Sequence, residues 1–126
     1  MQLTGFIAVF IGGGLGSLCR YAISLLVIRA TETRFPMATL SANVLSCIVM
    51  AAFLIYASSR LEEGSWQRLF ILVGFCGGFS TFSTFSLENF QLIKQGDMGL
   101  LALNIILSVL LCLLVFVSFQ RGYKFL

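Results

Sequence analysis

Hydrophobic and polar positions divide the chain into four long apolar segments that are joined by short polar connections. The segments cover about residues 3–28, 37–57, 69–90 and 100–119. Each has about the 20 residues that a helix needs to cross a bilayer. The pattern therefore predicts an all-α integral membrane protein with four transmembrane helices. The connections are too short for a separate soluble domain, so one domain, residues 1–126, is expected.

Composition supports the same class of protein. Hydrophobic residues make up 59% of the chain and charged residues only 10%, proportions far from those of a soluble domain. Residues 1–4 lack the basic region that opens a secretory signal, so we expect the first segment to remain as a membrane span. The expected location is the cell membrane, which the chain crosses several times.

The distribution of basic residues gives almost no preferred orientation. In the predicted topology, four basic residues lie on the side of both termini and three on the opposite side. The first set is Arg60, Arg68, Arg121 and Lys124, and the second is Arg29, Arg34 and Lys94. Either this small bias orients the chain, or the chain inserts both ways and pairs with an inverted copy. Pairing would suit the size, because four helices leave little room for an enclosed aqueous path.

The histidine and acidic content excludes most kinds of catalytic site. The chain has no histidine, and Glu88 is the one acidic residue inside an apolar segment. The others are Glu32, Glu62, Glu63 and Asp97. This inventory cannot supply a hydrolytic triad, a pair of carboxylates at membrane depth or a histidine metal site, so we expect no enzyme activity.

The four cysteines are spread one per apolar segment, without the Cys-x-x-Cys spacing of many metal and redox sites. They are Cys19, Cys47, Cys76 and Cys112. Cysteines at such positions usually act as small buried hydrophobic residues, and we assign them no role.

The third segment contains a run of glycine and hydroxyl residues, GGFSTFSTFS at positions 77–86. Hydroxyls have no hydrogen-bond partner in hydrocarbon, so this run is tolerated only inside protein or along a polar path. The Ser-Thr-Phe triplet occurs twice, which on a continuous helix forms three rows. The rows are Ser80 with Ser83, Thr81 with Thr84, and Phe82 with Phe85. They predict a track of hydroxyls beside positively polarised ring edges, which favours an anion.

The Gly77-Gly78 pair in the same run predicts a distortion of the third helix, either a kink or a break. A broken helix frees carbonyls, which suit a small hard cation, and N–H groups, which suit an anion. A cation pathway would be expected to use carboxylates or rings of carbonyls. The run at 77–86 contains no carboxylate.

Asparagine and serine residues add polar groups to the second and fourth segments. Asn43 lies about 9 Å from the start of the second segment by helix rise. Its amide either joins helices or donates to an anion in a pore. Asn104 and Ser108 share one face of the fourth helix, where helix packing is favoured over substrate contact.

In the first segment, Gly12 and Gly16 form a small-xxx-small pair that predicts close helix packing. Arg20 continues the same row one turn further on. Its guanidinium either reaches the lipid headgroups or draws anions into a vestibule. In both cases it marks an interface.

With these residues the chain resembles the Fluc fluoride channels, the CrcB family of microbial membrane proteins. The resemblance covers nearly the whole chain and rests on three motifs. They are Gly12-Gly13-Gly14-x-Gly16 with Arg20, Thr39-Leu40-x-x-Asn43, and GFCGGFSTFSTFS at 74–86. The chain departs from the family pattern at four positions. Ser80 replaces threonine, Ala38 replaces glycine, and Ser46 and Ala51 stand where glycines are common.

The resemblance implies an antiparallel, dual-topology homodimer with two fluoride pores and a third helix broken near residues 77–80. It implies a structural sodium ion on the dimer axis, held by the main-chain carbonyls of Gly77 and Ser80, with the Thr81 hydroxyl as a further candidate. The implied pore residues are Asn43, Phe82, Phe85, Ser83 and Thr84, and we count Ser108 with them. The implied vestibule residues are Arg20 and Glu88.

By this resemblance the chain is expected to be a passive fluoride exporter that confers fluoride resistance. Its expected partners are fluoride, an inverted copy of itself and membrane lipid, with no nucleic acid. A small multidrug transporter is the main alternative, but it needs a carboxylate in the first helix, where this chain has only Arg20. A non-transporting assembly subunit would explain the packing glycines but not the two Ser-Thr-Phe triplets.

Overall fold

The computed structural model of the chain describes residues 2–57 and 60–120. Within them the chain forms four helical spans that are long and apolar enough to cross a membrane, and no strand. The spans are α1 (Gln2–Ala30), α2 (Met37–Tyr56), a composite third span (Trp66–Gln95) and α6 (Met98–Gln120). The predicted class of four-helix membrane protein is therefore confirmed. Arg121 and Lys124, which were counted for the orientation, lie outside the described residues.

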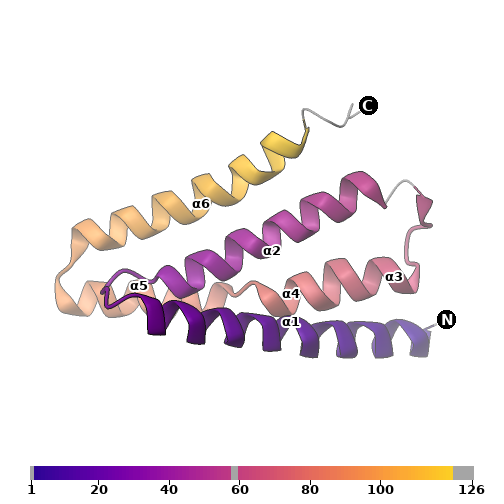
Figure 1. The fold of residues 1–126 in the computed structure, drawn as a ribbon, viewed down its shortest axis with the longest axis horizontal. Coiled ribbons are helices and arrows are strands. Elements are labelled where there is room, and N and C mark those ends of the chain that lie inside the picture. Colours follow the sequence, from indigo (N-terminus) through magenta and orange to yellow (C-terminus); the bar gives the residue numbers. More distant parts are fainter. Residues whose placement is uncertain (1, 58–59, 121–126) are drawn as a thin grey trace.

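The third span is built from four consecutive helical pieces. They are α3 (Trp66–Arg68), the π-helix η2 (Leu69–Phe75), α4 (Cys76–Phe79) and α5 (Phe82–Gln95). Ser80 and Thr81 lie between α4 and α5 in extended conformations, so the span is interrupted near its middle, as Figure 1 shows. The span also continues past its predicted end at residue 90.

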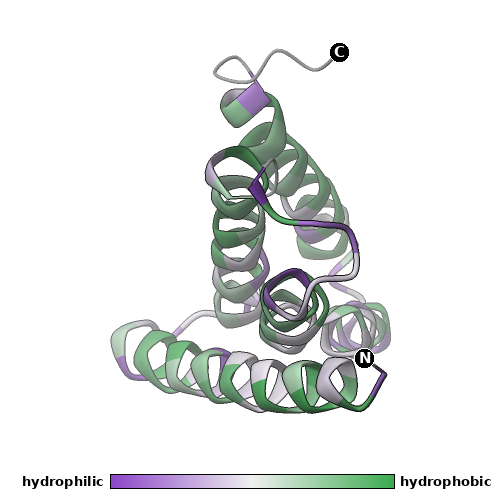
Figure 2. Ribbon diagram, turned by 90° about the vertical axis from the view of Figure 1, so that its right-hand side faces the viewer, coloured by the Kyte–Doolittle hydropathy of each residue, from purple (hydrophilic) through white to green (hydrophobic). Residues whose placement is uncertain are grey.

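α2 packs against α6 and against the third span, and α6 also contacts α5 of that span. α1 lies against η2 and α4 and contacts α2 as well (Figure 1). Seen from the end, α1 crosses the other spans at an angle (Figure 2). Apolar residues make up most of the helices in the same view, and many of the large ones are exposed. Phe10 on α1, for example, is 82% exposed. Such outward apolar faces suit a lipid surrounding rather than water.

Glycines allow the backbone of α1 to touch the backbone of the third span. A Cβ atom on Gly16 would clash with the carbonyl oxygen of Phe75, and one on Gly78 would clash with that of Gly13. Gly12 is in equally close contact with the third span. Side chains larger than hydrogen would separate the two helices, so the predicted close packing of Gly12 and Gly16 is confirmed.

Small residues serve the same purpose on α2. Ser46 and Ala51, two of the departures from the family pattern, are each 2% exposed. The Ser46 hydroxyl donates a hydrogen bond to the carbonyl oxygen of Cys76 at 2.9 Å. The hydroxyl that replaces a glycine hydrogen therefore has a partner inside the protein, which removes the cost of burying it.

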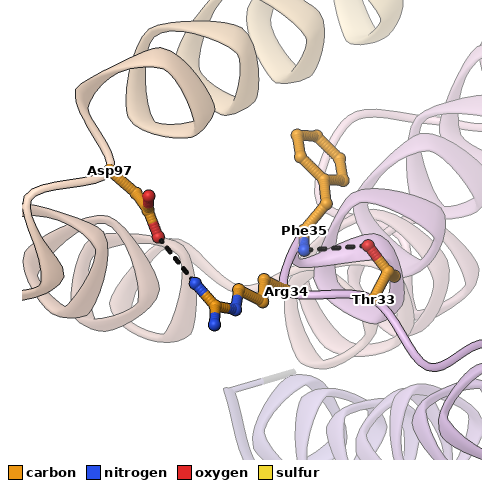
Figure 3. A network of polar contacts seen from close by, with 4 residues as sticks. All are labelled: Thr33, Arg34, Phe35 and Asp97. Atoms are coloured by element: carbon orange, nitrogen blue, oxygen red, sulfur yellow. Dashed lines mark hydrogen bonds and ion pairs between the residues drawn. The ribbon is translucent and has the colours of Figure 1, made fainter.

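Two connections meet at one end of the bundle. The carbonyl oxygen of Pro36, the N-cap residue of α2, accepts from the Leu40 N–H at 3.1 Å. Gly96 ends α5 with a φ of 77°, a conformation that favours glycine. Arg34 of the first connection and Asp97 of the third form an ion pair at 3.8 Å (Figure 3). This pair links the start of α2 to the start of α6.

Candidate functional site

The interruption of the third span is the centre of the candidate site. The last helical bond of α4 joins the Ser80 N–H to the Cys76 carbonyl oxygen at 3.0 Å. Thr81 then acts as the N-cap of α5, since its hydroxyl oxygen accepts from the Thr84 N–H at 3.2 Å. The predicted row from Ser80 to Ser83 assumed a continuous helix and is wrong, because Ser80 and Thr81 are extended.

Asn43 of α2 holds the extended residue Thr81 by two hydrogen bonds. Its Oδ1 accepts from the Thr81 N–H at 2.7 Å, and its Nδ2 donates to the Thr81 carbonyl oxygen at 3.4 Å. Only one orientation of the amide satisfies both bonds. An interrupted helix exposes main-chain groups that have no water partner at membrane depth, and Asn43 satisfies one donor and one acceptor there.

Hydroxyls gather on the α5 side of the interruption. The Thr81 Oγ1 donates to the Thr84 Oγ1 at 3.0 Å and lies 3.3 Å from the Ser83 Oγ. The structure therefore brings together three of the predicted track residues. Ser80 is not joined to them, because its hydroxyl donates back to the Cys76 carbonyl oxygen at 2.9 Å.

The two predicted ring residues lie one turn apart at the start of α5. The ring centroids of Phe82 and Phe85 are 5.8 Å apart, and the ring planes are tilted by 39°. Phe82 is 79% exposed. One face of this ring pair is therefore open to whatever surrounds the single chain.

A pocket of about 290 Å³ joins α2, the interruption, α5 and α6. Among the described residues that line it are four of the six predicted pore residues, Asn43, Phe82, Phe85 and Ser108. Ser80 and Thr81 line it as well. Ser83 and Thr84 are not among the described residues that line it. The polar lining of this pocket consists of amide, hydroxyl and thiol groups, with no carboxylate from the described part of the chain.

The pocket also includes residues that the sequence analysis did not assign, namely Cys47, Val109 and Cys112. The spacing of the two cysteines could have pointed to them. Cys47 follows Asn43 by one helical turn, and Cys112 follows Ser108 by one turn. That signal becomes useful only once α2 and α6 are known to pack together.

Ser108 is also part of a buried polar cluster. Its hydroxyl donates to the Asn104 Oδ1 at 3.3 Å, and the Asn104 Nδ2 donates to the Asn89 Oδ1 at 2.8 Å. Asn104 is 1% exposed. The predicted shared face of Asn104 and Ser108 therefore packs against α5, as favoured from the sequence. Asn89 was missed as the partner because its position relative to α6 depends on the fold.

Glu88 lies in a different environment from the pore candidates. Its Oε1 accepts from the Thr39 hydroxyl at 2.7 Å, while its Oε2 is buried without a hydrogen-bond partner within the described residues. Glu88 lines a second pocket of about 250 Å³ with Arg34, Gln91 and Gln95. Arg20 is not among the described residues that line either pocket, so the two predicted vestibule residues do not meet in one chain.

The fold and the site define the class of the protein. Four apolar spans, an interrupted third span and a pocket that places amide and hydroxyl groups beside the interruption are the features of a helical membrane protein that handles a small polar or ionic solute. A family profile described as CrcB-like protein, Camphor Resistance (CrcB), matches residues 7–119. The chain belongs to this family.

Individual relatives agree with the family. The chain is 41% identical over 104 residues to a protein of Azobacteroides pseudotrichonymphae, covering 81% of this chain and 82% of the relative. It is 39% identical over 120 residues to a protein of Pyrococcus abyssi, covering 94% and 96%. A protein of Koribacter versatilis is 35% identical over 113 residues, covering 90% of each. All three relatives are named fluoride-specific ion channel FluC.

This membership places the chain among ion channels rather than enzymes. The four apolar helices and the channel family together identify a multi-pass protein of the cell membrane.

Proposed function

We propose that the chain forms a channel through which fluoride leaves the cytoplasm passively. The names of its relatives support fluoride as the solute. The single observation that carries the proposal is the convergence of Asn43, Phe82, Phe85 and Ser108 on one pocket. Amide N–H groups, hydroxyls and the positive edges of aromatic rings all interact favourably with an anion.

The pore residues would replace the water that fluoride loses on entering the membrane. Asn43 uses one amide N–H for Thr81, and its second N–H is available in principle to an anion, since the group carries two. The hydroxyls of Ser83 and Thr84 continue the polar path along α5. Between Asn43 and Thr84, a small anion could therefore move from one donor to the next without passing a carboxylate.

The second wall of each pore would come from an inverted copy of the chain. Phe82 is mostly exposed in the single chain, so a closed path past its ring needs another surface. Near-balanced basic residues allow both orientations in the membrane. A two-fold axis between inverted copies would repeat the path, which gives two pores per homodimer.

A sodium ion at the centre of that dimer is the proposed cofactor. Because the Thr81 N–H is bonded to Asn43, the carbonyl of Gly77 lies beyond the last helical bond of α4 and is free of the helical ladder. The carbonyl of Ser80 belongs to the extended segment. Oxygen donors of this kind fit a small hard cation.

Side chains offer less to such a cation. Within the described residues, no group of three His, Cys, Asp or Glu residues could hold a metal ion. The Thr81 hydroxyl already donates to one group and accepts from another, which makes it the weakest of the three candidates. Two carbonyls per chain are fewer than the oxygens that a hard cation commonly takes, so the inverted copy would add two more carbonyls to the site.

Arg20 and Glu88 are assigned to the pore entrances. Arg20 lies one turn beyond Gly16 on α1, and Glu88 lies on α5 in a pocket lined by the first connection. Both are on the side of the interruption that leads toward that connection. An arginine there would raise the local concentration of anions.

Fluoride export through such a channel would be driven by the fluoride gradient and the membrane potential, without a chemical reaction in the protein. Hydrogen fluoride is a weak acid that crosses the membrane as a neutral molecule and ionises in a less acidic cytoplasm. The trapped anion then leaves down its gradient, aided by a membrane potential that is negative inside. Export of this kind would confer resistance to fluoride.

Fluoride release from liposomes tests the proposal. Vesicles that contain the purified full chain are loaded with potassium fluoride, and external fluoride is followed with an electrode. A passive channel releases fluoride only after a potassium ionophore is added, because charge must be balanced. No release after the ionophore, at protein densities that give several chains per vesicle, would reject the proposal. Full release without the ionophore would also reject it, because this would indicate a proton-coupled carrier.

A further inference from the structure

Two thiols form a second layer of the pocket that contains Asn43 and Ser108. Cys47 and Cys112 each follow one of these residues by one helical turn. α2 and α6 pack together and run in the same direction (Figure 1). The register that brings Asn43 and Ser108 to one pocket therefore brings the two cysteines together as well, and both line the pocket.

The two thiols belong to the same pocket. Cys47 and Cys112 line it from the two helices α2 and α6, which pack together, and both cysteines are free and only partly buried. Cys76 lies near Cys47 but is fully buried and does not belong to the described lining of the pocket. The pocket is therefore lined by two cysteine thiols, one from α2 and one from α6.

We propose that Cys47 and Cys112 form a two-coordinate binding site for a soft cation of the Hg(II) class. Thiolates are soft ligands that select soft metals over the hard cations bound by carbonyls. Structural zinc takes four ligands, and the described residues hold no group of three candidate side chains. A site of two sulfurs therefore favours a cation that is satisfied by two ligands in a line.

Charge balance favours a divalent ion at this depth. Each thiol loses its proton when it binds a metal. One Hg(II) ion would replace two protons, so the complex Cys47–Hg–Cys112 carries no net charge. A neutral complex avoids the cost of placing an uncompensated charge in the membrane.

The position of the site has a consequence for transport. The cation would occupy the same pocket as Asn43 and Phe85 and would narrow the proposed fluoride path. This consequence rests on the proposed function, whereas the binding of the cation does not. The two can therefore be tested separately.

Binding is measured on the purified full chain with mercuric nitrate in chloride-free buffer. A monothiol competitor is present so that isolated cysteines do not retain the metal. After the competitor has been removed, X-ray absorption gives the number of sulfur ligands, and near-ultraviolet charge-transfer absorption gives the amount bound. We expect one mercury per chain with two sulfur ligands in the parent. Cys47→Ser and Cys112→Ser should each weaken binding about 100-fold, since a chelate becomes a single ligand.

The matched control is Cys19→Ser, because Cys19 lies on α1 outside the described lining of the pocket. It should bind mercury as tightly as the parent does. A single sulfur ligand in the parent would overturn the proposal. Equal affinity of the parent and the double variant Cys47→Ser/Cys112→Ser would also overturn it.

Transport is measured by fluoride release, with each variant compared with its own rate before mercury is added. We expect about a tenfold loss of rate in the parent, because the bound ion occupies the path, and recovery after addition of a dithiol. The double variant should resist inhibition, and Cys19→Ser should be inhibited like the parent. If mercury inhibits the double variant as strongly as the parent, the inhibition does not come from Cys47 and Cys112, and the proposed block is wrong. If the parent protein releases no fluoride, the proposed channel function is wrong. The binding measurement still decides whether the metal site exists.

Discussion

Asn43 forms hydrogen bonds with both main-chain polar groups of Thr81, at 2.7 Å to the N–H and 3.4 Å to the carbonyl oxygen. The partners are 38 residues apart in the chain. An interrupted membrane helix leaves such groups without water, so the amide stabilises the interruption itself. The residue proposed to contact an anion is therefore also the residue that keeps the surrounding backbone in place.

Substitutions of Asn43 should separate these two roles. Asn43→Leu removes both bonds and leaves two main-chain groups unsatisfied, so we expect a loss of about 2–4 kcal/mol in stability. Asn43→Asp retains an acceptor for the Thr81 N–H and should preserve more of that stability. Its negative charge, or its single donor when protonated, should still impair fluoride release. Thermal unfolding in detergent and liposome flux measure the two effects, and normal flux through Asn43→Asp would argue against anion contact at this residue.

Gly16 on α1 and Gly77 on the third span should respond differently to substitution. Gly16 is in contact with the third-span backbone, so Gly16→Ala should destabilise the single chain by about 1–3 kcal/mol through overpacking. A Cβ on Gly77 would meet nothing within 4 Å, so Gly77→Leu should leave the single chain folded. If Gly77 lies at the proposed sodium site, Gly77→Leu should weaken dimer assembly or stop transport.

Gly99 provides the matched control for Gly77, because a Cβ there also meets nothing within 4 Å. Gly99→Leu should assemble and conduct like the parent. Mass measurement in detergent and flux in liposomes compare the two variants. Normal dimers and normal flux for Gly77→Leu would mean that this glycine is only a tolerated residue in the helix.

The number of spans could be predicted because bilayer thickness sets the length of an apolar segment. The resemblance put the interruption near residues 77–80, and Ser80 is indeed one of its two extended residues. The local sequence pattern could not give its exact place. The Gly77-Gly78 pair predicts a distortion, yet both glycines remain helical in α4, where Gly78 packs against Gly13. The extended residues follow at Ser80 and Thr81, where a bond from a distant helix stabilises them. Such a tertiary contact has no local sequence pattern.

The same limit applies to the site. Spacing alone correctly placed Asn104 and Ser108 on one face, because four residues make about one helical turn. Their partner Asn89 and the pairing of Cys47 with Cys112 depend on which helices are neighbours. The pore roles of the residues around the pocket remain predictions, which the experiments on the purified protein address.

Topology can be tested by shifting the basic residues. Glu32→Lys with Gln95→Lys adds positive charge to the end that carries the first and third connections. Glu62→Lys with Glu63→Lys adds it to the opposite end, and all four positions are exposed. Each pair should lock one orientation, so each variant alone should fail to conduct. Co-expression of the two should restore fluoride release. Full activity from one locked variant would contradict the inverted homodimer.

The aromatic rings provide the most direct test of the proposed path. Phe82→Ile and Phe85→Ile keep most of the apolar volume, and near-volume-conserving changes usually cost less than about 1.5 kcal/mol. If the rings only fill space, the variants should fold and conduct like the parent. If their positive edges contact fluoride, the anion would instead face methyl groups, and flux should fall sharply while the protein stays folded.

Phe90→Ile is the control on the same helix, since Phe90 is 54% exposed and lies outside the described lining of the pocket. Phe90→Ile also replaces an aromatic ring with a branched aliphatic side chain, but it leaves the proposed path unchanged. The fluoride flux of this variant should therefore equal that of the parent. Flux is compared at equal protein density, with the oligomeric state of each variant checked beforehand. A selective loss in Phe82→Ile and Phe85→Ile would locate the anion at the ring pair. Equal flux in all three variants would show that the Ser-Thr-Phe repeat does not form the path.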